Sequence, residues 1–280
     1  MTNVAVVGPG LLGGSIALAL QRQPGTRVAV WGRRGEAVEE ARRRGLAAFA
    51  STEIGAVVRD ADLVVLCTPI GVMPVLAREI APIIRPEAIV TDVGSVKQAV
   101  VAELAPIFEP RGRFVGSHPM AGSEQTGLEA ARADLFEGAV CIVTPNARTP
   151  ESAASEVSAF WERLGCRVRV LDPGEHDDIA ALVSHLPHLL AATLVQTVAG
   201  KNGEAFEFAG PGFRDATRVA SGAPAMWAEI LQTNREAVCR GAEAMIEKLR
   251  EIITLLERAE PMSGFLSEAK DLRDRLRLRN

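Results

Sequence analysis

The chain has 280 residues, of which 48% are hydrophobic and 24% charged, and its formal net charge is −4. These values are typical of a soluble globular protein with one large domain or two ordinary ones. The acidic balance excludes a general nucleic-acid-binding protein. The absence of tyrosine excludes the short-chain dehydrogenases that use a Tyr-x-x-x-Lys pair.

Targeting and redox features favour the cytoplasm. We expect no apolar run to span a bilayer, and no basic segment precedes the first apolar residues as it would in a signal peptide. The cysteines lie far apart without Cys-x-x-Cys spacing, at Cys67, Cys141, Cys166 and Cys239. We therefore expect reduced thiols in a cytoplasmic protein that does not bind a membrane.

The chain begins with a short apolar run followed by glycines at the spacing Gly-x-Gly-x-x-Gly. Residues 4–7 have the composition of a buried strand, and residues 16–20 continue as an apolar helix. The first glycine permits a tight turn, the second lets the backbone approach phosphates, and the third allows helix and strand to pack closely. The helix N-terminus then binds the anionic pyrophosphate. This order predicts a dinucleotide site at Gly8, Gly10, Leu11, Leu12 and Gly13.

Short β-rich runs alternate with helical patterns as far as residue 172. The runs are residues 4–7, 27–31, 63–67, 88–93, 114–116, 140–143 and 167–170. Continuous apolar runs suit strands buried on both faces, so we expect a Rossmann-type, doubly wound, mostly parallel sheet over residues 1–172. Ligands bind such sheets at the carboxyl ends of the strands. Those ends carry the glycines, residues 32–34, Thr68-Pro69, Gly94-Ser95 and residues 117–119.

The alternation of β-rich and helical patterns ends at residue 172. Helical patterns cover about 175–201, 224–258 and 263–277, residues 210–212 form a candidate linker, and no convincing strand follows. We therefore expect an α/β domain over residues 1–172 and an all-helical domain over 173–280. Helices as apolar as residues 179–194 need a partner surface, which predicts a homodimer through the C-terminal helices.

The end of the second predicted strand bears on the choice of cofactor. NAD-binding folds usually place an acidic residue there for the ribose 2′-hydroxyl, but this chain has Gly32 followed by Arg33 and Arg34. Guanidinium groups pair well with a phosphate and gain little from a hydroxyl. The sequence therefore favours NADP, leaves NAD possible through backbone contacts, and makes FAD the weaker alternative. Thr68 and Pro69 are expected to line the same site.

His118 is the main candidate for acid–base chemistry. It follows a predicted strand and so belongs at the ligand edge of the sheet, and histidine titrates near neutrality. A packed loop histidine is the alternative. Ser95 also follows a strand, where it could contact His118, the cofactor or substrate, or could cap a helix.

Two more histidines and an arginine are candidates for the substrate site. His185 and His188 are spaced to lie on one face of a helical turn. With His176, Asp177 and Asp178 nearby, a metal site is conceivable, but these spacings match no usual ligand pattern and we predict no metal. Arg218 could bind an anionic substrate through both guanidinium nitrogens, or could instead form an ion pair between domains.

Together these pieces resemble the prephenate/arogenate (cyclohexadienyl) dehydrogenase family. The matching segments occur in order along nearly the whole chain: residues 8–15 (GPGLLGGS), 92–97 (DVGSVK), 116–124 (GSHPMAGSE), 183–188 (VSHLPH), 213–221 (FRDATRVAS) and Met226-Trp227. The family combines a Rossmann-type domain with a helical dimerisation domain. It oxidises and decarboxylates a cyclohexadienol, so the resemblance implies prephenate or L-arogenate as substrate and a role in tyrosine biosynthesis.

The resemblance also implies roles for individual residues. His118 accepts the proton of the ring hydroxyl, and Ser95 orients His118 and contacts the nicotinamide side. Arg218 holds a substrate carboxylate, and His185 contacts the side-chain end of the substrate. Further pocket residues are Ser123, Glu124 and Asp215. We expect no fused mutase domain before the first strand and no regulatory domain after the helical domain.

Two other functions remain as alternatives. A β-hydroxyacid dehydrogenase shares this fold but would use a catalytic lysine of the helical domain, where the chain offers Lys201, Lys248 and Lys270 in no glycine-rich context. A non-catalytic dinucleotide sensor would not need His118, His185 and Arg218 in one cleft. Between the two substrates, the neutral surroundings of His185 favour prephenate, whereas Glu124 could bind the ammonium group of L-arogenate.

Overall fold

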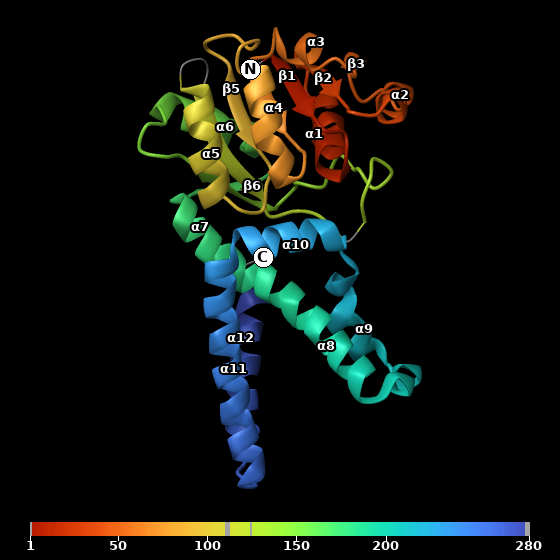
Figure 1. Ribbon diagram of the computed structural model, residues 1–280, viewed down its shortest axis with the longest axis vertical. Coiled ribbons are helices and arrows are strands. Elements are labelled where there is room, and N and C mark those ends of the chain that lie inside the picture. Colours follow the sequence, from red (N-terminus) through yellow and green to blue (C-terminus); the bar gives the residue numbers. More distant parts are fainter. Residues whose placement is uncertain (1, 110–112, 124, 278–280) are drawn as a thin grey trace.

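The computed structural model describes residues 2–109, 113–123 and 125–277 (Figure 1). The N-terminal part of the chain forms a sheet covered by helices. The C-terminal part consists of helices, two groups of which extend away from the sheet as separate arms. One arm is built around helix α8 (Leu186–Asn202), and the other around α11 (Arg235–Glu257) and α12 (Ser263–Arg277).

Eight strands form one sheet in the order β3-β2-β1-β4-β5-β6-β7-β8. Their bounds are β1 Asn3–Val7, β2 Arg27–Trp31, β3 Phe49–Ser51, β4 Leu63–Leu66, β5 Ile89–Asp92, β6 Arg113–Pro119, β7 Val140–Thr144 and β8 Arg167–Val170. Neighbouring strands are parallel except β6 and β7, which are antiparallel. The predicted mostly parallel sheet is therefore confirmed.

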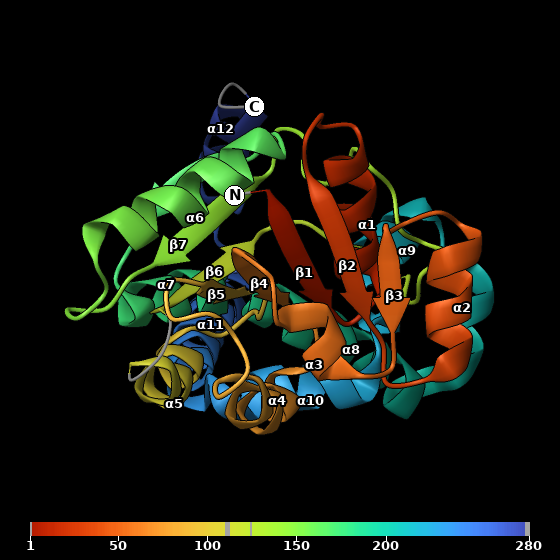
Figure 2. The ribbon, with the colours of Figure 1, turned by 90° about the horizontal axis from the view of Figure 1, so that it is seen from above.

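Helices cover both faces of the sheet (Figure 2). Along β1, Val4 and Val6 pack into one hydrophobic core and Ala5 and Val7 into the other, because successive side chains of a strand point to opposite faces. The first core takes side chains from α1 (Leu11–Gln21), α2 (Gly35–Arg43) and α6 (Glu151–Arg163). The second takes them from α3 (Ile54–Val58), α4 (Met73–Ile80) and α5 (Gln98–Phe108). The sheet is thus doubly wound, as predicted.

Two strands differ from the sequence prediction. Strand β3 was not predicted, because it has only three residues and leaves Phe49 46% exposed at the edge of the sheet. Strand β6 continues beyond the predicted residues 114–116 to Pro119, and pairs His118 with Ile142 of β7. His118 therefore lies within a hydrogen-bonded strand, where backbone pairing fixes its position better than a loop would.

The C-terminal helices are more broken than the sequence indicated. The predicted helix 175–201 is α7 (Pro173–Ala180), a π-helical stretch (Ala181–His185) and α8. The predicted helix 224–258 is α10 (Pro224–Thr233) and α11, separated at Asn234. The predicted linker 210–212 was wrong, because α9 (Pro211–Thr217) starts with its proline in the first turn, which suits a residue without an N–H group.

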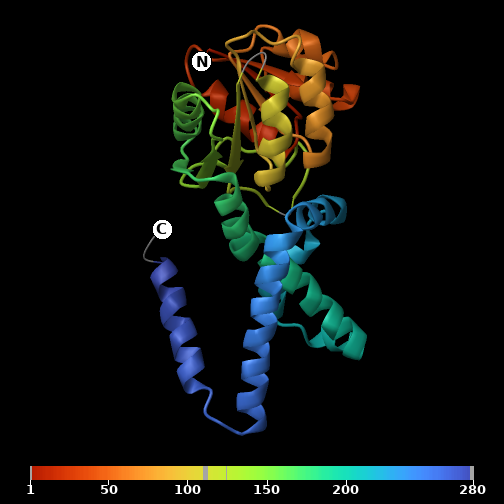
Figure 3. The same cartoon turned by 60° about the vertical axis from the view of Figure 1, so that its left-hand side comes forward.

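One stretch contradicts the expectation that no apolar run could span a bilayer. Residues Pro173–Phe208 are long and apolar enough by length and composition, and 33% of their most apolar window is buried. The exposed apolar side chains of the helical part include Leu182, Val183, Ile253 and Phe208. Figure 3 shows α11 and α12 as the two legs of an open hairpin. Apolar side chains of both helices are exposed, among them Ile253 and Leu266.

Candidate active site

The glycine turn between β1 and α1 is shaped by close backbone contacts. A Cβ atom on Gly13 would lie 2.1 Å from the carbonyl oxygen of Gly8, and one on Gly8 would lie 2.6 Å from that of Cys67. Gly8 also has a φ of 110°, which side chains rarely adopt. A Cβ atom on Gly10 would have no described atom within 4 Å apart from its chain neighbours. The turn is therefore tight where it packs and open where a ligand could approach the backbone.

A cavity of about 740 Å³ opens beside this turn. Its lining includes Gly8, Gly10, Thr68 and Pro69, together with Arg33 and Arg34. Leu11 and Leu12 begin α1 at the turn, partly buried. Ser95 is not among the residues that line this cavity.

The features of this cavity fit a dinucleotide. No side chain of the described residues caps the N-terminus of α1, so its first N–H groups are available to an anion. Thr68 lines the same cavity, and its hydroxyl oxygen is buried with no hydrogen-bond partner among the described residues. A buried polar group normally has a partner. A bound cofactor would supply partners for the N–H groups of α1.

Both arginines after β2 are exposed at the rim of this cavity. Arg34 stands at the N-cap position of α2, and Glu36 lies in the first turn of that helix. Glu40 also lines the cavity, but its carboxylate is paired with Arg43 and Arg44. The end of β2 therefore offers two guanidinium groups to a ligand, as the sequence indicated.

A second cavity, of about 380 Å³, lies between the sheet and the helical part. His118 and Ser123 contribute from the β6 side, and Arg218 contributes from the segment after α9. Ser184, Met226 and Trp227 also line it. The structure thus brings His118, Ser123 and Arg218 to one cavity, although Arg218 is about a hundred residues from the other two in the chain.

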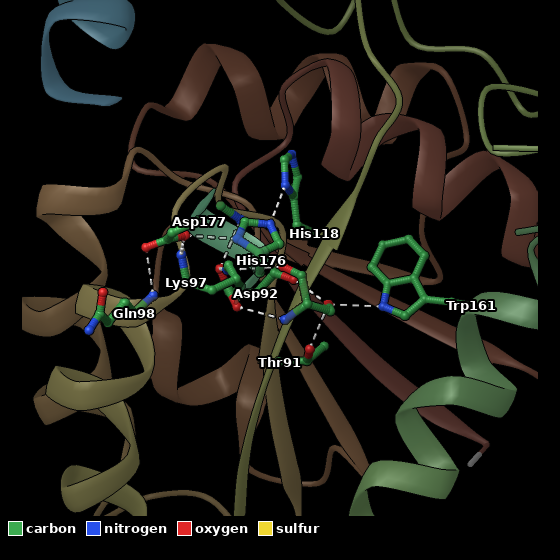
Figure 4. A network of polar contacts seen from close by, with 10 residues as sticks. Thr91, Asp92, Lys97, Gln98, His118, Trp161, His176 and Asp177 are labelled. Atoms are coloured by element: carbon green, nitrogen blue, oxygen red, sulfur yellow. Dashed lines mark hydrogen bonds and ion pairs between the residues drawn. The ribbon is translucent and has the colours of Figure 1, made fainter. Parts of the chain in front are cut away.

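His118 is the start of a buried chain of hydrogen bonds (Figure 4). Its Nδ1 lies 2.8 Å from Nε2 of His176, and Nδ1 of His176 lies 2.8 Å from Oδ1 of Asp177. His118 is 7% exposed and His176 is fully buried. Because Nδ1 of His118 is engaged in this way, Nε2 is the ring nitrogen left for a ligand.

A buried ion pair lies next to this chain. Nζ of Lys97 contacts the carboxylate of Asp92 and also donates to the carbonyl oxygen of Ser117, at 3.0 Å. Both charged side chains are fully buried. The Asp92 carboxylate also accepts from the backbone N–H groups of Gly94 and Ser117, at 2.8 and 3.0 Å. This pair joins the end of β5 to β6 directly beneath His118.

The surroundings keep His118 neutral. Burial lowers the pKa of His118 well below its usual value, and the neighbouring His176, Lys97 and His185 lower it further. Burial also lowers the pKa of His176, against the opposing effect of Asp177. An imidazole that is neutral near pH 7 can accept a proton, which is the state that a general base requires.

His185 and His188 both contact Trp227, an indole that lines the second cavity. The rings of His188 and Trp227 are stacked, with centroids 3.7 Å apart, and His185 meets the indole edge to face at 6.3 Å. Nδ1 of His185 accepts from Asn234, at 3.1 Å. Burial lowers the pKa of His185 to about 4. The structure therefore places both histidines against the indole, and His185 is not a lining residue of the cavity.

Several predicted positions stand apart from this site. Asp215 is exposed on α9 and does not line the cavity, and Glu124 lies outside the described residues. The hydrogen bond that was expected to orient His118 from Ser95 is made by His176 instead. Lys248 and Lys270 pair with acidic residues of their own helices, away from both cavities. Within the described part of the chain, no cluster of three or more potential metal ligands occurs, and all four cysteines are free.

The sequence analysis missed the role of His176 and Asp177, which it considered only as metal ligands. It also did not predict the pairing of Lys97 with Asp92. The sequence carried one signal for this pair, because Asp92 lies near the end of a predicted strand, five residues before Lys97, and lysine is almost never fully buried without a partner.

Comparisons with known proteins match both halves of the chain. A model of the prephenate dehydrogenase nucleotide-binding domain matches residues 16–170. A model of the prephenate dehydrogenase dimerization domain matches residues 172–269. The chain belongs to the prephenate dehydrogenase family. It is therefore an oxidoreductase with a nucleotide-binding domain, as the resemblance implied. The exact division between residues 172 and 173 stays a prediction.

Relatives with full-length similarity carry related names. The chain is 36% identical to the prephenate dehydrogenase of Bacillus subtilis, over 99% of this chain and 76% of that protein. It is 34% identical to the cyclohexadienyl dehydrogenase of Zymomonas mobilis, over 91% of this chain and 88% of that protein.

Solved structures of this family have the same fold. Prephenate dehydrogenase from Aquifex aeolicus, in complex with hydroxyphenyl propionate and NAD+, superposes with a TM-score of 0.92 at 33% identity, over 99% of this chain and 98% of that one. Synechocystis arogenate dehydrogenase superposes with a TM-score of 0.85 at 30% identity, over 98% of this chain and 100% of that one.

Proposed function

We propose that this enzyme converts prephenate to 4-hydroxyphenylpyruvate by oxidative decarboxylation, with NAD(P)+ as its cofactor, in tyrosine biosynthesis. The observation that carries the proposal is the presence of a neutral histidine and an arginine, His118 and Arg218, on the wall of one cavity. A substrate with an alcohol to deprotonate and carboxylates to bind needs these two groups. The family membership supports the same reaction.

The chemistry divides between the cofactor and the protein. Bound NAD(P)+ accepts the hydride from the carbinol carbon, while the ring carboxylate leaves as CO₂ and its bonding electrons complete the aromatic ring. Nε2 of His118 takes the hydroxyl proton: the O–H bond breaks and an N–H bond forms. Once the loss of CO₂ has made the ring aromatic, the proton returns from Nε2 to the ring oxygen, which leaves a phenol and a neutral His118. Because aromatisation drives the reaction, the protein chiefly has to accept this proton, orient the substrate and bind its charge.

The other pocket residues have supporting roles in this proposal. Arg218 binds a substrate carboxylate, and Ser123 contributes a hydroxyl to the same cavity. His185 and His188 hold Trp227, whose indole shapes the wall on the substrate side. Ser95 follows β5 and lines neither cavity, and we assign it as a contact for the nicotinamide. Glu124 and Asp215 are retained as residues that shape or gate the pocket when substrate is bound.

L-arogenate is the second candidate substrate, because the chain is 30% identical to an arogenate dehydrogenase of known structure. L-arogenate carries an ammonium group where prephenate has a keto group. Among the described residues, no carboxylate lines the substrate cavity. A buried ammonium group without a carboxylate partner is costly, so the described lining favours prephenate. Glu124, which lies outside the described residues, is the carboxylate that would favour L-arogenate instead.

Absorbance of the reduced cofactor tests the proposal and the role of Arg218 together. We expect reduction with prephenate, and a smaller kcat/KM with L-arogenate. Arg218→Gln is expected to raise KM for prephenate by about 10- to 100-fold, because a charged hydrogen bond to a carboxylate is worth roughly 1.5–3 kcal/mol. An unchanged KM would assign Arg218 to a structural ion pair, and no reduction with either substrate would refute the reaction.

The two arginines after β2 support a preference for NADP over NAD, although the Aquifex aeolicus relative was crystallised with NAD+. Arg33 and Arg34 flank the cavity where the adenosine ribose would lie. Replacing both by Ala is expected to lower kcat/KM for NADP by about 10- to 100-fold, and that for NAD by less than about threefold. Arg78→Ala is a matched control, because Arg78 is an exposed arginine that pairs with Glu103 on α5. Equal or better efficiency of the unaltered enzyme with NAD would contradict the preference.

A homodimer is part of the proposal. The exposed side chains of Ile246, Leu249, Ile253 and Leu256 recur every three or four residues along α11, so they form one apolar stripe. Such a stripe needs a partner surface in water. Since residues 172–269 match a dimerization domain, a second copy of this chain is the partner, in an intertwined dimer in the cytoplasm.

A further inference from the structure

The buried chain behind His118 links two parts of the fold. His118 belongs to β6 of the sheet, whereas His176 and Asp177 belong to α7, the first helix after the sheet. Asp177 also accepts from two backbone N–H groups at the start of α5, those of Lys97 at 2.7 Å and Gln98 at 3.0 Å. Figure 4 shows the side chains of His118, His176 and Asp177 linked in that order, with Asp177 facing α5.

The donors and acceptors of this chain can be assigned from Asp177 outward. Both of its oxygens already accept backbone N–H groups, and an ionised carboxylate has acceptor atoms only. Nδ1 of His176 must therefore be the donor to Oδ1. A neutral imidazole has one donor and one acceptor nitrogen, so Nε2 of His176 is an acceptor. Nδ1 of His118 is then the donor to it, at 2.8 Å.

We propose that His176 and Asp177 are positioning residues that hold His118 in the tautomer with its proton on Nδ1, so that the lone pair on Nε2 faces the substrate cavity. The proposal rests on the proposed role of His118 as the base. When Nε2 takes the substrate proton, the positive charge forms on an imidazole whose Nδ1–H already donates to His176. The hydrogen bonds to His176 and Asp177 then stabilise the charged form without any further transfer.

The hydrogen bonds that fix the tautomer of His118 therefore form only when α7 packs against the sheet. Asn234 reinforces this docking, because its amide donates to the backbone carbonyl of Asp177 at 2.8 Å and to His185 at 3.1 Å. The charged and titratable groups facing the two histidines come from every element around them: Asp92 of β5, Lys97 before α5, Asp177 of α7 and His185 of the π-helical stretch. Asp177 is the one carboxylate among these that hydrogen-bonds to an imidazole.

Asp177→Asn tests the proposal, with Asp178→Asn as the matched control. Asp178 is the next residue in the chain, is exposed, and pairs with Arg240 instead of a histidine. We expect Asp177→Asn to lower kcat by at least about 10-fold with KM changed less than about threefold, as when a carboxylate that fixes a histidine tautomer is removed. The acidic limb of kcat/KM should also move to lower pH, which a purely structural defect would not cause. Asp178→Asn should match the unaltered enzyme.

Variants of His176 provide a second test of the proposal. His176→Leu removes the acceptor for Nδ1–H of His118, whereas His176→Gln keeps a carbonyl oxygen that can accept this hydrogen bond. We expect kcat to fall in the order unaltered enzyme, His176→Gln, His176→Leu. Equal kcat in all three, or an Asp177→Asn enzyme with unaltered kcat and pH profile, would overturn the proposal.

Nitrogen-15 NMR of the resting enzyme remains decisive if a variant fails to fold. The chain has only four histidines, so His118 can be assigned by its absence from the spectrum of His118→Asn. We expect its Nδ1 to be protonated and its Nε2 unprotonated at pH 7. The opposite tautomer would refute the positioning role even if the enzyme catalyses the proposed reaction. If the predicted tautomer is found but the enzyme does not catalyse that reaction, only the proposed function is refuted.

Discussion

His118→Asn is expected to lower kcat by about 10²- to 10⁴-fold, the usual contribution of a general base. Asparagine can still accept or donate a hydrogen bond at this position of β6, but it cannot take a proton near neutral pH. KM for prephenate should change less than about threefold, because the variant keeps Arg218, the proposed carboxylate contact, which lines the same cavity. Steady-state kinetics and single-turnover kinetics with the reduced cofactor as the signal would measure both quantities.

The pH profile provides the control for this variant. The pKa of His118 is lowered, so the neutral base is present above that pKa and is lost as pH falls through it. The acidic limb of kcat/KM, which reports the free enzyme, should therefore lie below about pH 6.5, the usual pKa of histidine. The residual activity of His118→Asn should lack this limb. A limb above pH 6.5, or the same limb in the variant, would assign the proton to another group.

The central strands could be predicted from the sequence because they are buried on both faces. The runs of β1 and β4 are apolar enough to be recognised alone, and their burial in two cores explains why. The predicted run 167–170 is also a strand, β8, although it is mostly exposed. Strand β3 has no such signal, since three residues at the edge of a sheet need little apolar surface. The break at Asn234 is also invisible in the pattern. Asn234 is buried because its amide satisfies Asp177 and His185, and both of these contacts are distant in sequence.

The candidate site was predictable where one residue carries one role. His118 and Arg218 follow from the chemistry of imidazole and guanidinium in recognisable segments, and the structure places both in one cavity. His176 and Asp177 could not be assigned in this way. His176 is 58 residues from His118, and their contact depends on how α7 packs against the end of the sheet. Their clustering in the sequence pointed to a metal site, whereas their geometry gives a hydrogen-bonded chain.

Lys97→Met is expected to lower the free energy of unfolding by about 3–5 kcal/mol, because it leaves the Asp92 carboxylate buried without its counter-ion. The double variant Lys97→Met/Asp92→Asn removes both charges, and should recover most of this loss. Lys248→Met is the matched control: its partner Glu251 is exposed on α11, so the change should leave the free energy of unfolding nearly unaltered. Urea unfolding at one fixed protein concentration would measure all three, since a dimer's stability depends on concentration. A single variant as stable as the control would show that the pair contributes no net stability.

The same variant separates electrostatics from folding at the active site. Lys97 lowers the pKa of His118, so its removal should move the acidic limb of kcat/KM to higher pH in the molecules that remain folded. Asp177→Asn removes a negative charge from the other side of the two histidines, and should move the limb to lower pH. A general loosening of the site would shift both variants in the same direction. Opposite shifts would therefore show that Lys97 and Asp177 act on the base through their charges, with Lys97 keeping it unprotonated and Asp177 stabilising the proton that it accepts.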